Sequence, residues 1–463
     1  MSTTETRVFR GTGDLSAFLA SRIEPAWMRK FREAALKRFS ALEWPTTHEE
    51  EWRRSDISNY DFDSYNYGLQ AGAAVPTHAV DAIPAGYAGY ARFENGQCVS
   101  LVLKPELAER GVRLVSLNEL FSDLAAEEAG KKPAVGTVTV VAASPEAKAL
   151  ENLLRKSLEN VDNRIQAWHY CSITHGVYFF VPSFVEVSEP VLVEYYGSGE
   201  EALLVPETVV ILEKGARGQL VQRVAGDSDG ALLWNEASDI QVKDAASLVC
   251  LSVEQINIDS SWFSNGSSWV NRDASLVHFA AVFGGMFAKN RVDCVLDGPG
   301  SDLRLNGIYF GHEDQHFDVR TVQHHNAPHA VSRTYYKGAV KDEAHAIYQG
   351  LIQVAHEATR TDAFLNDKNL ILNDGARADS IPSLQINTDD VKCSHGSTTG
   401  RLDENQVFYL MVRGYSREEA EELLVEGFFG DLIDHAPEPA REQLRGVIMR
   451  RLLAQTSANG ENE

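Results

Sequence analysis

The stretch PETVVILEKGARGQLVQRV (Pro206–Val224) contains two short runs of strand-forming residues on either side of a Gly-containing turn. The same arrangement recurs around the turns LDGPGS, which begins at Leu296, and LNDGAR, which begins at Leu372. Short runs of β-branched, aliphatic and aromatic residues between Gly, Asp, Asn and Pro are typical of strands. A turn that recurs between such runs is typical of a stacked repeat.

This β pattern continues from about Trp168 to Val391, and few stretches within it could form a long helix. The fold class is therefore predicted to be mainly β. Periodicity alone does not distinguish a β-sandwich, a β-barrel and a β-helix, so all three architectures remain open at this level.

Helical periodicity occurs on both sides of the β region. Before it, helices are predicted over Pro25–Phe39, Leu114–Ala129 and Glu146–Glu159, and a further helix is expected to begin within Thr47–Ser58. After it, Ser416-Arg-Glu-Glu419 has the spacing of a capping box, in which the Ser and Glu side chains satisfy each other's backbone N–H groups. The apolar stripe predicted for this helix is Ala420, Leu423, Leu424 and Phe428, and a second helix follows Pro437 and Pro439.

These patterns divide the chain into four expected regions. They are an N-terminal helical region (1–135), a β core (136–410), a C-terminal helical module (411–455) and a disordered tail (456–463).

The chain of 463 residues carries a formal net charge of −23, with 44% hydrophobic and 24% charged residues. This charge argues against binding to nucleic acid, which requires basic residues, and against binding to an anionic membrane surface. No window approaches 18 consecutive apolar residues and the first residues lack the apolar core of a secretory signal, so a cytoplasmic protein is expected. The five cysteines are scattered and never in C-x-x-C spacing, which excludes a conventional Cys-rich permanent cluster site.

The sequence Cys393-Ser-His395 is the strongest candidate for a site. The residues around it predict a strand, in which residues two apart project from the same face. Thiolate and imidazole are suited to binding iron, copper or zinc. The alternative is a buried thiol beside a hydrogen-bonded histidine with no metal.

Five segments of the chain resemble the SufB/SufD family of iron–sulfur cluster assembly proteins, and they resemble its SufD members more than its SufB members. The segments are DDVKCSHGSTTGRLDENQVFYLMVRGYSREEAEELLVEGFF (Asp389–Phe429), EEEWRRSDIS (Glu49–Ser58), GVYFFVP (Gly176–Pro182), QHFDVRTVQHH (Gln315–His325) and YYKGAVKDEAHAIYQGLIQV with the following TDA (Tyr335–Val354, Thr361–Ala363).

This resemblance implies a right-handed parallel β-helix-like core flanked by N-terminal and C-terminal helical domains. It implies a scaffold subunit that pairs through its β core with a SufB-like paralogue, with a homodimer as the alternative for the isolated chain. A transient iron–sulfur cluster would form at that interface, and none would be bound permanently. His395 matches the family's functional histidine and would be a metal ligand, and Cys393 matches its neighbouring interface cysteine.

The resemblance also implies that the C-terminal helices bind a SufC-like ATPase. The candidate partner-binding residues are Arg417, Leu423, Leu424, Gly427, Phe428 and Phe429. The alternative is that this helix packs only on its own domain.

Two other histidine patterns receive structural interpretations. His312-Glu-Asp-Gln-His316 matches the zinc-protease motif H-E-x-x-H, but its strand–turn–strand context lacks the helix that makes the two histidines converge. A concentration of His and Asp residues is interpreted as polar side chains that pair across stacked strands rather than as a metal site. Its members are His316, Asp318, His324, His325 and His329.

The chain contains no P-loop, no G-x-G-x-x-G that opens a helix, no pyridoxal-lysine signature and no G-x-S-x-G elbow. A non-catalytic scaffold is therefore expected. One alternative is a SufB-like homodimeric scaffold, which is disfavoured because Asp362–Asp374 lacks the cysteine that SufB proteins carry there. Another is a β-helix enzyme that acts on polysaccharides, disfavoured because Asp389 and Asp390 would project to opposite faces of a strand.

Overall fold

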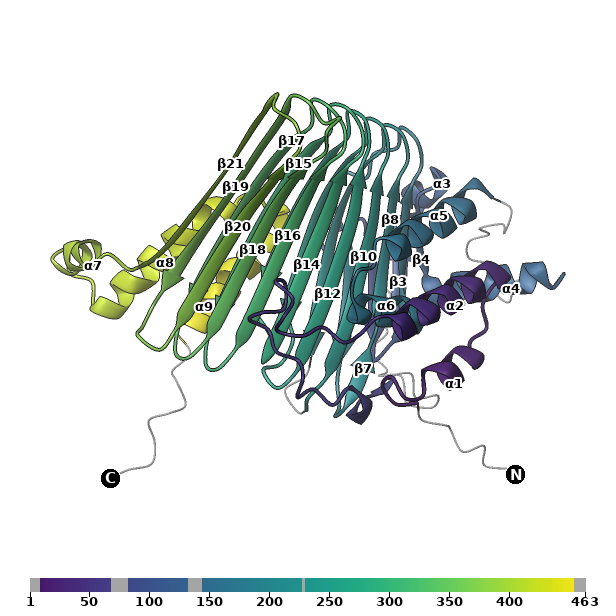
Figure 1. Cartoon of the computed structure of the whole chain (residues 1–463), viewed down its shortest axis with the longest axis horizontal. Coiled ribbons are helices and arrows are strands. Elements are labelled where there is room, and N and C mark those ends of the chain that lie inside the picture. The colour runs from purple at the N-terminus through teal and green to yellow at the C-terminus, as the bar shows by residue number, and fades with distance from the viewer. Residues whose placement is uncertain (1–8, 68–81, 132–143, 227–229, 454–463) are drawn as a thin grey trace.

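The computed structural model describes residues 9–67, 82–131, 144–226 and 230–453. Its centre is a parallel β-helix made of two sheets that face each other (Figure 1). From β8 to β21 the chain alternates between the sheets, so each of these strands pairs in parallel with the strand two places further on. Sheet A contains, in order, β20, β18, β16, β14, β12, β10, β8, β5 and β4, and sheet B contains β21, β19, β17, β15, β13, β11, β9, β6, β2 and β3. This confirms the predicted mainly β fold with a β-helix core between helices.

The strands of the core have the following bounds. In sheet A they are β5 (His175–Val181), β8 (Pro206–Leu212), β10 (Leu233–Val242), β12 (Ser261–Val270), β14 (Phe287–Leu296), β16 (His316–His325), β18 (His345–Val354) and β20 (Arg377–Ile386). In sheet B they are β6 (Val191–Gly197), β9 (Arg217–Gly226), β11 (Ser247–Gln255), β13 (Ser275–Val282), β15 (Asp302–Gly311), β17 (Val331–Val340), β19 (Thr361–Ile371) and β21 (Val391–Arg401). The short β7 (Ala202–Leu204) pairs with β1 (Asn66–Tyr67) and β10.

The repeated turns that predicted stacking do connect consecutive strands of the β-helix, but on two different edges. LEKGAR leads from β8 in sheet A to β9 in sheet B and LDGPGS likewise from β14 to β15, whereas LNDGAR leads from β19 in sheet B back to β20 in sheet A. Gly215 and Gly300 in the first two of these turns have φ values of +67° and +74°, a left-handed conformation that glycine adopts without steric cost.

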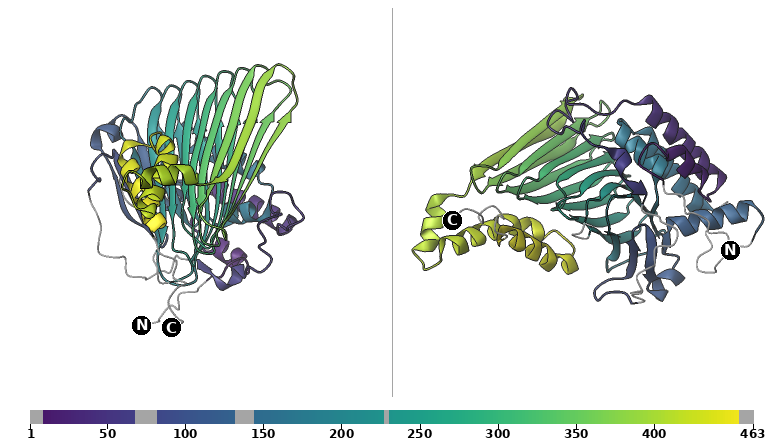
Figure 2. Two further views of the ribbon diagram at one scale, coloured as in Figure 1. Left: turned by 90° about the vertical axis from the view of Figure 1, so that its left-hand side faces the viewer. Right: turned by 90° about the horizontal axis from the view of Figure 1, so that it is seen from below.

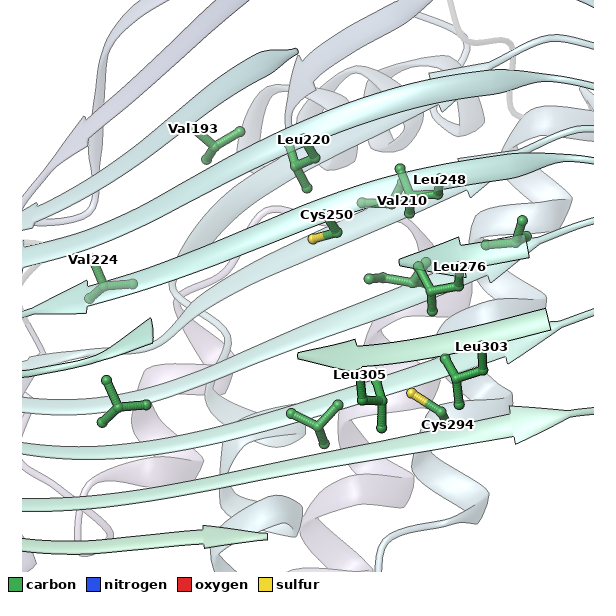
Figure 3. Close-up of a cluster of buried hydrophobic side chains, with 14 of the residues drawn as sticks. Val193, Val210, Leu220, Val224, Leu248, Cys250, Leu276, Cys294, Leu303 and Leu305 are labelled. Atoms are coloured by element: carbon green, nitrogen blue, oxygen red, sulfur yellow. The ribbon is translucent and has the colours of Figure 1, made fainter. Parts of the chain in front are cut away.

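Alternate residues of each strand fill the interior between the sheets, because side chains of a strand point to opposite faces. Figure 3 shows part of this interior, where side chains such as Leu220, Cys250, Leu276 and Leu305 project between the strands. In-register pairing stacks these residues in columns, as when Cys250 of β11 lies beside His278 of β13. The interior is therefore a continuous core that extends along the β-helix.

The first turns of the β-helix are covered by the N-terminal region (Figures 1 and 2). Its helices are α1 (Leu15–Ala20), α2 (Ala26–Ala41), α3 (Pro105–Glu109), α4 (Leu117–Glu128), α5 (Pro145–Glu159) and α6 (Arg164–Ser172), with the short 3₁₀ helix η1 (Phe62–Ser64). The prediction that this region is helical was incomplete, because it also contributes β2 (Gly89–Glu94), β3 (Gln97–Leu103) and β4 (Arg113–Ser116) to the sheets. Leu114 lies within β4 and belongs to the interior core, so the helix predicted to begin there begins instead at Leu117.

The helix expected within Thr47–Ser58 was wrong. This segment forms turns that lie on the outer face of sheet A. The backbone carbonyl of Glu51 accepts hydrogen bonds from Lys289 and Gln349, and Trp52 packs under the Lys289 ammonium at 4.3 Å. Contacts to three different strands hold the segment as a series of separate turns, each closed by an i→i+3 hydrogen bond, rather than as a continuous helix.

The C-terminal helices are α7 (Glu404–Met411), α8 (Arg417–Ile433) and α9 (Glu438–Leu453). Helices α8 and α9 pack on the outer face of sheet B, where Val425, Phe429 and Val447 meet apolar residues such as Phe279 and Phe310. The capping box at Ser416 and Glu419 is present. The predicted stripe of α8 was right at Ala420, which is completely buried, and in part at Phe428, but wrong at Leu423, which is exposed. Sheet B lies against Val425, Phe429, Leu432 and Ile433.

The division into four regions stays a prediction, and the tail 456–463 lies outside the described residues. The helices α5 and α6 fall within the range expected for the β core. No helix among the described residues combines the length and apolarity that a membrane span requires.

Candidate functional site

Strand β21 carries Cys393 and His395 on the inner face of the last turn of the β-helix. Cys393 is in register with Ala363 of β19, and His395 is in register with Leu365. Ala363 and Leu365 are buried in the interior core. Because residues two apart in a strand project from the same side, the thiol and the imidazole both lie on the interior side of the sheet.

The two side chains differ in exposure. His395 is exposed, whereas Cys393 is half-buried against the core. Burial raises the pKa of the Cys393 thiol, and the nearby charge of Asp362 raises it further, against a backbone hydrogen bond with Ala363. The thiol is therefore protonated at neutral pH, and a metal that binds this sulfur must displace its proton.

The chain by itself offers few ligands at this place. Within the described ranges there is no group of three or more His, Cys, Asp and Glu side chains that could hold a metal ion. Two ligands from one strand leave two positions of a tetrahedral iron open. The arrangement suits a metal or cluster whose other ligands come from a second molecule.

The last turn, made of β20 and β21, is called the open end here. In the part of the chain that the structure describes, no strand pairs with the outer edge of either strand. Ile386 of β20 is 39% exposed, although its register partner Val354 in β18 is completely buried. A sheet edge with unpaired backbone groups and a partly exposed core favours association with another chain.

A buried carboxyl group lies one strand behind the open end. Asp367 of β19 is completely buried, and its side chain accepts hydrogen bonds from the Asn369 amide at 2.6 Å and from the Tyr309 hydroxyl at 3.5 Å. It is in register with Ser397 of β21, two residues beyond His395. Burial raises the pKa of Asp367 to about 6, and side-chain hydrogen bonds with Ser380, Asn369 and Tyr309 oppose that shift.

Sequence reasoning missed Asp367. The run TDAFLNDKNLI was considered only for the absence of a cysteine. The signal that could have identified Asp367 is the alternation of side chains between the two faces of a strand. This alternation places Ala363, Leu365, Asp367 and Asn369 on one face. That face is apolar at its beginning and polar after Leu365, which marks an interior polar position.

The other histidines have the structural roles that the sequence indicated. His312 lies in the turn between β15 and β16 and pairs with Gln315, while His316 begins β16, so the two do not converge. Within the histidine and aspartate group, His324 is hydrogen-bonded to Gln353 on the adjacent strand and His325 to Ser332. Burial lowers the pKa of His325 to about 4, which keeps its imidazole neutral.

The remaining members of that group are also engaged or lie in a turn. His316 is hydrogen-bonded to Ser55 at 3.1 Å, and Asp318 accepts hydrogen bonds from Ser55 and Lys289. His329 has a φ value of +61° in the turn between β16 and β17.

The six C-terminal candidate residues are not equivalent. Phe429 is completely buried between α8 and sheet B, so it can support a partner surface but not touch a partner. Arg417 forms an ion pair with Glu404 of α7 at 2.6 Å. The other four line a groove between α8, the end of β19 and the segment after β21; they are Leu423, Leu424, Gly427 and Phe428.

Helix α7 exposes apolar residues that sequence reasoning did not single out. Phe408 is 66% exposed and Val412, just after the helix, is 68% exposed. Tyr409, Met411 and Tyr415 are exposed beside them. Figure 1 shows α7 projecting beyond the last strands. The run VFYLM is apolar on all sides, which is typical of a buried helix and therefore indicates a missing partner.

Comparisons with known proteins agree with this arrangement. A family model described as "SUF system FeS cluster assembly, SufBD core domain" matches residues 195–428. An iron–sulfur cluster assembly SufBD family protein of Mycobacterium bovis is 33% identical over 299 residues, which covers 63% of this chain and 74% of the relative.

Two relatives carry the name SufD. The Escherichia coli protein is 30% identical over 242 residues, covering 52% of this chain and 57% of the relative. The Bacillus subtilis protein is 23% identical over 444 residues, covering 95% and 97%. The chain belongs to the SufBD family of iron–sulfur cluster assembly proteins and is a homologue of SufD.

Proposed function

We propose that this chain is a non-catalytic scaffold subunit that pairs with a SufB-like paralogue and recruits a SufC-like ATPase. The nascent iron–sulfur cluster is its cargo and is held at the interface between the paralogues. The observation that carries this proposal is the open end, where Cys393 and His395 lie beside an unpaired sheet edge.

The open end supports pairing with a related β-helix. A second chain with its own edge strands could extend both sheets and cover Leu384 and Val391, which pack only partly against the core, and the exposed Ile386. A second copy of this chain could occupy the same edge, and a homodimer is therefore the competing outcome when the paralogue is absent.

A shared interface also explains how a cluster could be built and then released. Cys393 and His395 would supply part of the iron coordination, and the paralogue would supply the rest. Because neither chain alone completes the coordination, separation of the two chains would expose the cluster for transfer. The isolated chain is then expected to bind no stable cluster.

The ATPase-binding surface proposed here combines α7 with the groove on α8. Phe408 and Val412 supply exposed apolar area, and Leu423, Gly427 and Phe428 line the adjacent groove. Apolar residues next to a groove resemble the anchor positions of protein interfaces. ATP hydrolysis in the bound ATPase would then change the geometry of the paired β-helices.

The two alternative functions fit the geometry less well. Asp389 and Asp390 lie in the exposed turn between β20 and β21, where Asp390 is near Arg360, and they do not line a cleft as a carboxylate pair for glycoside hydrolysis would. A SufB-like homodimeric scaffold needs the cysteine that Asp362–Asp374 lacks.

The proposal is tested by purifying the tagged full chain from its native host and identifying the proteins that co-purify. The expected result is a SufB paralogue and a SufC-type ATPase in stoichiometric amounts. A monomer that carries neither protein and cleaves polysaccharides would overturn the proposal.

A further inference from the structure

Asp367 is a buried acid without a counter-ion. No Lys, Arg or His among the described residues forms an ion pair with it. The side chains that interact with the carboxyl group, Asn369, Tyr309 and Ser380, are neutral. An unpaired buried carboxylate destabilises a fold, so a structural role alone gives no reason for an acid rather than an amide at this position.

The location of this acid is specific. It lies on the inner face of β19, in register with Ser397, so a single strand separates it from the free edge of sheet B. Strands in a sheet lie about 4.8 Å apart, and two residues along a strand span about 6.6 Å. The register position of His395 is therefore on the order of 8 Å from that of Asp367.

The groups that face Asp367 do not neutralise its charge. Tyr309 of β15, Tyr336 of β17 and Tyr348 of β18 surround this part of the interior, and burial raises the pKa of each phenol. All three are neutral at physiological pH. On the same face of the neighbouring strand β21 lie Cys393, His395 and, four residues beyond Ser397, Arg401, which is paired with Asp374.

We propose that the Asp367 carboxylate is a positioning group of the open end, whose buried negative charge favours ferrous iron at Cys393 and His395. This inference rests on the proposed function, because it assigns the open end as the place where iron binds. Charges interact strongly across a few ångströms of protein interior, where water does not screen them. The carboxylate therefore acts without touching the metal.

The test uses the anaerobic full chain titrated with Co²⁺, a spectroscopic stand-in for Fe²⁺ whose thiolate charge-transfer band reports binding to Cys393. We expect Asp367→Asn to weaken binding about tenfold at pH 7.5, from the Coulomb interaction at this separation. The Co²⁺ dissociation constant of Asp367→Asn divided by that of the wild type should fall toward one as the pH decreases through about 6. Asp367 becomes protonated in this range, so the wild type loses the charge that the variant lacks. Asp314→Asn is the matched control, since it removes the same charge from an exposed turn between β15 and β16.

One further variant and one further measurement keep the result unambiguous. Tyr309→Phe retains the carboxylate but removes a donor to it, so the pH at which the Asp367 effect disappears should move upward. Asp367→Asn should raise the melting temperature, because it removes a buried acid. Equal Co²⁺ affinity of wild type and Asp367→Asn at pH 7.5, or a ratio that does not depend on pH, would overturn the inference.

The variants His395→Ala and Cys393→Ala separate this inference from the proposed function. If they abolish the charge-transfer band while Asp367→Asn has no effect, the iron site stands and only the role of Asp367 is refuted. If neither changes Co²⁺ binding, the open end of the isolated chain does not bind the metal and this inference is wrong, whereas the proposed function is decided by the co-purification experiment.

Discussion

The β-helix contains two Cys–His pairs on its inner face, one in its middle turns and one at its open end. Cys250 of β11 and His278 of β13 are neighbours in register and line an interior cavity. Cys393 and His395 lie two residues apart on β21. His278 and His395 even belong to the same column of stacked residues, through Leu305, Thr334 and Leu365.

The two pairs differ in how deeply their side chains are buried. Burial raises the pKa of the Cys250 thiol to about 12 and lowers the pKa of His278 to about 4, so both stay neutral inside the protein. His395 is exposed and Cys393 is half-buried at an edge that a partner can reach. The same two residue types are thus interior side chains in one turn and candidate ligands in another.

The largest expected effect separates the two histidines. His395→Ala should leave folding and assembly with the partners intact, but it should lower cluster delivery in cells about 100-fold, because it removes a ligand. His278→Ala is the matched control and should leave delivery unchanged. The measurement is the activity of cluster-dependent enzymes in a strain that relies on this system, with complex formation checked by co-purification. Full activity of His395→Ala, or its loss through dissociation of the complex, would contradict the ligand role.

A second prediction contrasts the exposed helix α7 with the buried face of α8. The double substitution Phe408→Asp and Val412→Asp should weaken ATPase capture by about tenfold or more, which is ~1.4 kcal/mol for each factor of ten. Ile23→Asp is the control, since Ile23 is 76% exposed and lies far from α7 in the N-terminal region. Affinity is measured by calorimetry with the purified ATPase. Unchanged affinity of the double variant would place the ATPase-binding surface elsewhere.

A third prediction concerns pH and the middle turns. Burial raises the pKa of Glu236 to about 7 from an ordinary value of 4.5, against hydrogen bonds from Trp262 and Gln222. The folded state therefore holds this proton more tightly than the unfolded state. The stability that results is complete below pH 4.5 and is lost as the pH rises through about 7, by ~3 kcal/mol.

The variant Glu236→Gln removes this proton equilibrium. Its free energy of unfolding should fall less than that of wild type between pH 4.5 and 8, as measured by urea denaturation at several pH values. Parallel curves for the two proteins would show that Glu236 does not titrate in this range. Cluster delivery should be unaffected, because Glu236 lies in the closed part of the β-helix.

The smallest effect separates the two cysteines. Cys250→Ala should cost about 1 kcal/mol of stability, because it leaves a small cavity in the core, and should not change cluster delivery. Cys393→Ala should cost less stability and lower delivery by a smaller factor than His395→Ala does. Thermal unfolding and the same enzyme assays measure both. Equal losses of cluster delivery in Cys250→Ala and Cys393→Ala would contradict the difference proposed between the middle turns and the open end.

Much of the fold was predictable because strands and turns leave local patterns. The turns at Leu212, Leu296 and Leu372 indicated stacking, and the capping box at Ser416 located the start of α8. The choice of a β-helix over a sandwich or barrel came from resemblance, since strand pairing between distant turns leaves no local signal. The segment at Trp52 was misjudged for the same reason, because its path is set by Lys289 and Gln349.

The candidate site was predictable only in part. The sequence placed Cys393 and His395 on one face of a strand, but not at the open end of a stack. Asp367 and the exposed side of α7 depend on which surfaces other elements cover. The buried side of α8 was misjudged because apolar residues occur all around the helix. Contact with sheet B determines which of them are buried, and the sequence does not show this contact.

The central claim is that the open end forms part of the site where the nascent cluster is held. It is tested most directly by the iron and acid-labile sulfide content of the complex with the SufB paralogue and the ATPase, purified anaerobically after cluster assembly. We predict that the complex containing His395→Ala remains intact but loses nearly all iron and sulfide, while His278→Ala retains the wild-type amounts. An intact His395→Ala complex with full iron and sulfide content would contradict the account.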